Sequence, residues 1–90
     1  MGNQYSLFAS VSNHSLYDGL IRITEVNFSF KCMEVDSLNG KVILQSAILK
    51  NPLGDLPSGT AADIVDIYKD GTVHLRDHNG NIEHEARVEI

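Results

Sequence analysis

Asp66, His74 and Glu85 are the residues of this sequence whose types and spacing best fit a chemical site. If the segments around them form neighbouring antiparallel strands, the imidazole lies in a row between two carboxylates. Such a row can orient a histidine as a general base or bind a metal ion. The competing interpretation is a solvated, charged sheet face, and we favour it because side chains in mid-sheet have no pocket around them.

Other candidates for metal binding or nucleophilic chemistry give weaker signals. Of the four histidines, His74 and His78 have the i, i+4 spacing of a helical zinc site, but they fall in a predicted strand and turn, and the single cysteine, Cys32, has no cysteine partner. A cysteine in mid-strand is usually a small core residue. Residues 77–83 have the composition of a calcium loop, but the ligand order does not fit and no helix flanks them. We therefore predict no catalytic residue, no metal and no cofactor, and leave enzymatic activity open.

The row requires three antiparallel strands between residues 61 and 88, joined by two glycine turns. Gly71 can supply the positive φ of a three-residue turn, and Asn-Gly at 79–80 is typical of a two-residue type I′ turn. The resulting registers collect apolar residues on one face and alternating charges on the other. The predicted core face comprises Val65, Ile67, Val73, Leu75, Ile82, Ala86 and Val88. The predicted charged face comprises Asp66, His74, Arg76, Glu83, Glu85 and Arg87.

Residues 61–69 also permit a short helix. Thr60 and Asp63 have the spacing of a capping box, and apolar residues recur at helical spacing after them. We favour a strand, because β-branched residues dominate the segment and the strand register accounts for both faces. The choice between strand and helix stays open at this point.

The first third of the chain is predicted to form two further strands. Residues 4–11 alternate in part and predict a first strand, and 13–19 predict a loop with at most one helical turn. Residues 20–34 predict a long strand. Its alternation changes phase near residues 24–25, which indicates a bulge or bend in a curved sheet.

A glycine turn at residues 39–40 leads into a predicted strand at 41–49. Loops of two and three residues fit this hairpin almost equally well, so its register stays open. Residues 42–44 are consecutive and apolar, so both faces of that strand must be covered. Residues 51–60 hold both prolines and form a constrained loop of the kind that often has a binding function, although a passive crossover is the simpler interpretation.

Ninety residues suffice for one β domain spanning 1–90. We predict an all-β fold, a small six- to seven-stranded antiparallel barrel or strongly curved sheet that ends in a three-stranded meander. The nearest common type is the SH3-like barrel. The lone cysteine and the lack of a signal segment or long apolar run predict a cytoplasmic protein. The net charge of −5, from 12 acidic and 7 basic residues, disfavours a nucleic-acid-binding surface.

These features predict a non-catalytic protein-interaction module of the inhibitor or adaptor type, which forms a homodimer or binds one larger partner. Membranes and nucleic acids are not expected as partners. The predicted contact surface comprises Met33, Val35, Ile43, Leu49, Pro52, Leu53, Leu56 and Pro57. The alternative is a small ligand- or metal-binding enzyme centred on Asp66, His74 and Glu85.

Overall fold

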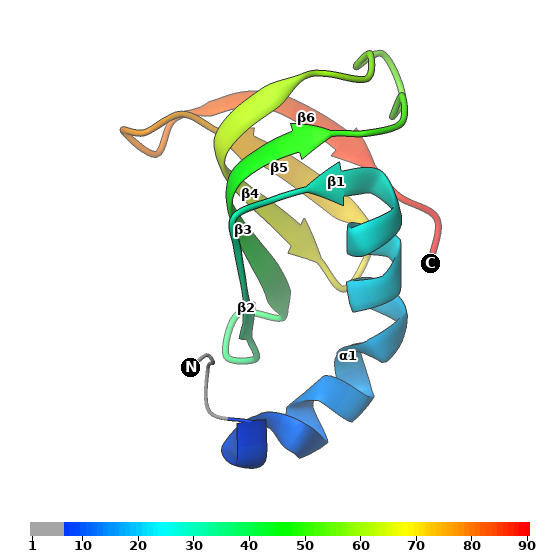
Figure 1. The fold of residues 1–90 in the computed structure, drawn as a ribbon, viewed down its shortest axis with the longest axis vertical. Coiled ribbons are helices and arrows are strands. Elements are labelled where there is room, and N and C mark those ends of the chain that lie inside the picture. The colour runs from blue at the N-terminus through cyan, green and yellow to red at the C-terminus, as the bar shows by residue number, and fades with distance from the viewer. Residues whose placement is uncertain (1–6) are drawn as a thin grey trace.

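The computed structural model describes residues 7–90, with side chains described from residue 17 onward, and shows one helix packed on a twisted antiparallel sheet (Figure 1). The elements are α1 (Leu7–Asn27), β1 (Phe28–Ser29), β2 (Cys32–Asp36), β3 (Lys41–Leu49), β4 (Ala61–Tyr68), β5 (Thr72–Arg76) and β6 (Ile82–Arg87). The strand order is β1-β3-β4-β5-β6, and β2 also pairs with β3.

The sheet is open. In the described residues no strand pairing joins β1 to β6, so these two strands remain at opposite ends of the order. The prediction of a mostly β chain is confirmed, whereas an SH3-like barrel is not. Of the two predicted architectures, the structure has the curved sheet.

The helix α1 shows that the predictions for residues 7–27 were wrong. Tyr17, Leu20 and Thr24 are buried, and their spacing of three and four residues puts them on one helical face against the sheet. The phase change near residues 24–25 is therefore helical periodicity and not a bulge between strands. The part of the predicted first strand at residues 4–6 lies outside the described residues.

Gly19 is the last residue of the predicted loop at 13–19, but it lies inside α1 on the exposed side. A Cβ atom built at Gly19 would meet nothing within 4 Å, so no close contact requires a glycine there. A glycine inside a helix costs about 1 kcal/mol relative to alanine. Burial of the opposite face of α1 offsets a cost of this size.

The C-terminal end of α1 is tied to the segment after β3. Asn51 donates a side-chain hydrogen bond to the carbonyl of Val26 at 2.9 Å, and the Lys50 amide donates to the carbonyl of Asn27 at 2.7 Å. Asn27 itself donates through Nδ2 to the carbonyl of Ile23 at 2.8 Å. The bonds to the Val26 and Asn27 carbonyls satisfy groups that the last helical turn leaves without partners, and they tie the end of α1 to the segment after β3.

The core lies between α1 and the concave side of the sheet. Its largest fully buried apolar side chains are Phe28, Leu44, Leu49, Ile67, Leu75, Val42, Val65 and Val73. Phe28 connects the two layers, because it follows α1 directly and pairs with Leu49 on β3.

The first hairpin of the predicted meander is confirmed. β4 is a strand, and Asp66 pairs with His74 while Val65 pairs with Leu75. Gly71 has a φ of 97°, as the three-residue turn requires.

The second hairpin differs from the prediction at its turn. His74 pairs with Glu85 as predicted, but Arg76 pairs with Ile82 and a bulge follows Leu75. Asn79 does not have the positive φ of a type I′ turn; only Gly80 does. Asp77 accepts hydrogen bonds from the backbone N–H groups of Asn79 and Asn81, and these favour a longer loop.

Because of this bulge, the predicted core face is wrong at Ile82, which is 49% exposed. Val65, Ile67, Val73, Leu75 and Val88 are buried as predicted, and Ala86 packs partly buried against them.

The hairpin before β3 has a turn of four residues, because Asp36 pairs with Lys41. Both loop lengths considered from the sequence were therefore too short. The side chain of Asp36 accepts hydrogen bonds from the backbone and side-chain amides of Asn39, which stabilises the longer turn. The strand itself, Lys41–Leu49, has the predicted bounds.

We expect the turns at Asp70 and Asp77 to loosen in acid. Backbone N–H groups of Thr72 and Asn81 hydrogen-bond the two carboxylates and lower the pKa of each below 3.8. A lowered pKa in the folded state gives stability above the unfolded value that is lost as the pH falls through the folded value. The melting temperature should therefore fall as the pH drops below the usual range of a carboxyl group. In D70N/D77N the fall should be smaller, and an unchanged fall would contradict this assignment.

Candidate functional site

Asp66, His74 and Glu85 lie in a row across β4, β5 and β6, as the predicted register requires. The Asp66 carboxylate is 3% exposed and faces two cations. Arg76 approaches with Nε 2.8 Å from Oδ2 and donates through Nη2 to Oδ1 at 3.1 Å, while Lys41 Nζ lies 3.2 Å from Oδ1. The Nε contact is an ion pair without a well-aligned hydrogen bond. The prediction of a solvated face is wrong for Asp66.

His74 interacts with an aromatic neighbour. Its ring meets Tyr68 edge to face, with centroids 5.3 Å apart and planes at 69°. Glu85 is exposed on the neighbouring strand. In the part of the chain that the structure describes, no three His, Cys, Asp or Glu side chains are grouped to hold a metal ion. The row is therefore a packed, partly charged sheet face.

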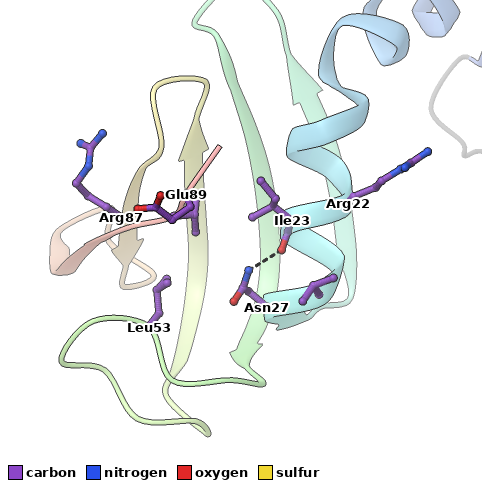
Figure 2. A pocket seen from close by; sticks show the side chains of 8 residues that line it. Arg22, Ile23, Asn27, Leu53, Arg87 and Glu89 are labelled. Carbon is purple, nitrogen blue, oxygen red and sulfur yellow. Dashed lines mark hydrogen bonds between the residues drawn. The ribbon is translucent and has the colours of Figure 1, made fainter.

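A second location has the geometry of a binding site. A cleft of about 400 Å³ opens between the last turns of α1 and the C-terminal segment (Figure 2). Its lining comprises Arg22, Ile23, Val26, Asn27, Leu53, Arg87, Val88 and Glu89. Figure 2 shows Ile23 and Asn27 extending from α1 toward the space, whereas the long side chain of Arg22 points away from it.

The position of the cleft follows from the open sheet. One wall belongs to α1, which leads into β1, and the other belongs to β6 and the residues after it. These are the two ends of the strand order, which a closed barrel would join. The cleft therefore occupies the opening of the sheet.

Gly71 holds the C-terminal wall close to the sheet. The Val88 amide donates to the Gly71 carbonyl at 2.8 Å, and a Cβ atom on Gly71 would lie 2.6 Å from the Val88 carbonyl oxygen. Only glycine permits this approach without a shift of the backbone.

The loop at residues 51–60, which contains both prolines, contributes Leu53 to the lining of the cleft. Leu53 and Leu56 exchange backbone hydrogen bonds of 2.9 and 3.0 Å, which close a tight turn over Gly54 and Asp55. This turn holds the Leu53 side chain in the cleft wall.

The residues predicted as a contact surface separate into groups. Leu49 is 1% exposed and belongs to the core, while Ile43 is half-buried on the outer face opposite Asp66. Four of the predicted contact residues are half-buried and pack against the core: Met33, Val35, Leu53 and Leu56. The two prolines of the loop, Pro52 and Pro57, are exposed. Only Leu53 among all of them lines the cleft.

Sequence reasoning missed the α1 wall of the cleft, Ile23 and Val26, because it assigned these residues to a strand. The available signal was the helical spacing of Tyr17, Leu20 and Thr24. A helix over these residues would have placed Val26 off the buried face.

No helix in the described part of the chain has the length and apolar character needed to cross a bilayer. No protein-family model matches the chain, and no curated protein and no solved structure is significantly similar to it.

Proposed function

We propose that this domain is a non-catalytic protein-interaction module that binds a segment of a partner protein in the cleft between α1 and β6. The observation behind the proposal is the apolar cleft at the opening of the sheet. Ile23 and Leu53 are half-buried in its walls, and Val26 remains 62% exposed there. Exposed apolar side chains that gather in a groove are typical of interaction surfaces.

The composition of the lining also suits a protein partner. Apolar walls are bordered by Arg22, Arg87 and Glu89, and an apolar centre with a polar rim is the usual anatomy of a protein interface. A stable interface buries roughly 800 Å² on each partner. The partner is therefore expected to extend beyond the cleft over neighbouring surface. We place this module in the cytoplasm, because the lone, exposed Cys32 suits a reducing compartment.

Selection from a random peptide library displayed on phage tests the proposal. We expect enriched peptides that bind the domain and lose at least about tenfold in affinity in Val26→Asp, because a charge then enters an apolar cleft. Leu38→Asp is the matched control: Leu38 is 94% exposed in the turn before β3, away from the cleft residues. It should leave the affinity unchanged. Failure to enrich any peptide, or equal binding to both variants, would overturn the proposal.

Self-association tests whether the partner is a second copy of the chain. Sedimentation at increasing concentration, repeated with Val26→Asp, distinguishes the two cases. A dimer that Val26→Asp dissociates would make a second copy the occupant of the cleft. A monomer at all concentrations, together with cleft-dependent peptide binding, would indicate a different protein.

A further inference from the structure

The backbone edge of β6 is free beside the cleft. Among the described residues β6 pairs only with β5, and the Val88 amide donates to the Gly71 carbonyl. Residues along an antiparallel strand alternate in the direction of their backbone groups. Val88 and Ala86 therefore direct these groups toward β5, whereas Arg87 and Glu85 direct theirs away from it. The edge offers N–H and C=O groups to one more strand.

The side chains along this edge alternate between two faces. Ala86 and Val88 point to the core side, where Val88 lines the cleft. Glu85 points to the opposite face and is exposed, as is Glu83 at the bulge. A strand added at this edge would therefore place alternate side chains in the cleft and beside carboxylates.

The carboxylates on this edge are not neutralised by the described residues. Neither Glu83 nor Glu85 forms an ion pair with any of them. The neighbouring cation, Arg87, already donates to the Thr72 hydroxyl at 3.2 Å and to the Asp70 carbonyl at 2.7 Å. The edge is acidic in a chain with a net charge of −5.

We propose that the occupant of the cleft is an extended, basic segment of another protein that pairs antiparallel with the free edge of β6. This proposal rests on the proposed function and specifies its partner. Apolar side chains opposite Val88 and Ala86 enter the cleft, and a basic side chain opposite Glu85 faces that carboxylate. A second basic side chain two positions further lies toward Glu83. A second copy of β6 is a poor occupant, because pairing about Glu85 would oppose like charges.

The probe is a synthetic peptide, acetyl-Leu-Glu-Val-Lys-Thr-Lys-amide, titrated into the intact domain and followed by NMR. We expect amide shifts concentrated along β6 and the cleft. E83K/E85K should weaken binding at least about tenfold, because attraction becomes repulsion at two positions. The peptide with glutamate in place of both lysines should then recover affinity for that variant. D18K/E34K changes the net charge equally at two exposed sites outside β6 and should have an effect below about threefold, since solvent ions screen distant charges.

Backbone methylation separates strand pairing from charge attraction. N-methylation of the lysine opposite Glu85 removes an N–H that points at β6 and should abolish binding, whereas N-methylation of the valine opposite Ala86 alters an N–H that points away. Equal effects of the two methyl groups, or no effect of E83K/E85K, would overturn the edge pairing. Peptides selected from the display library that still depend on Val26 would in that case leave the proposed function standing.

Discussion

Replacing Asp66 with alanine should lower the free energy of unfolding by about 3 kcal/mol, the low end of the cost of breaking a buried ion pair. The reason is that Asp66 is 2% exposed and opposes both Arg76 and Lys41, whose side chains are 25% and 15% exposed. Removal of the carboxylate leaves two poorly solvated cations side by side. For a domain of this size the melting temperature should fall by about 12–24 °C, measured by thermal and urea denaturation.

The control for Asp66 lies on the same strand. Asp63 is exposed, and Asp63→Ala should change stability by no more than about 0.5 kcal/mol. Lys41→Met removes only one of the two cations and leaves the contacts of Arg76 with Asp66. Its loss of stability should therefore lie between the losses in Asp66→Ala and Asp63→Ala. An Asp66→Ala variant as stable as Asp63→Ala would show that the carboxylate is not held between the cations.

Alternation predicts the face of a strand residue, but it does not predict whether that face is covered. Asp66 is on the face opposite the core, as the sequence indicated. It is nevertheless buried, because the long side chains of Arg76 and Lys41 converge on it and cover the carboxylate. These contacts depend on where the neighbouring strands lie. The pattern of opposite charges along one hairpin of the sequence does not predict these contacts.

Local chemistry explains why the C-terminal half was easier to predict than the N-terminal half. Gly71 determines the register of β4 with β5, and a slip by one residue would expose Val65 and Ile67. No comparable turn limits the register of the first segment. Its β-branched residues, such as Ile21 and Ile23, favour strands in isolation, whereas burial of one face against the sheet stabilises the helix.

The sequence did not predict the cleft, because it did not predict the helix α1. It exists only because α1, in place of a paired strand, occupies one side of the opening between β1 and β6. The loop at residues 51–60, whose prolines indicated a constrained conformation, contributes Leu53 to the cleft lining. The residues of α1 that face Leu53 are distant in sequence, and only the helix places them there.

Replacing Phe28 with alanine should cost about 3–5 kcal/mol, the usual range for truncating a buried phenylalanine. Phe28 is 1% exposed and joins α1 to the sheet through its pairing with Leu49. We expect a lower urea midpoint and faster amide exchange in α1, because the helix loses its fixed connection to the core. Phe30→Ala is the matched control and should cost about 1–2 kcal/mol, since Phe30 is only partly buried. Equal losses for the two variants would mean that α1 is not anchored at Phe28.

The cleft wall formed by α1 depends on this anchor, so Phe28→Ala should also weaken peptide binding under conditions in which the sheet remains folded.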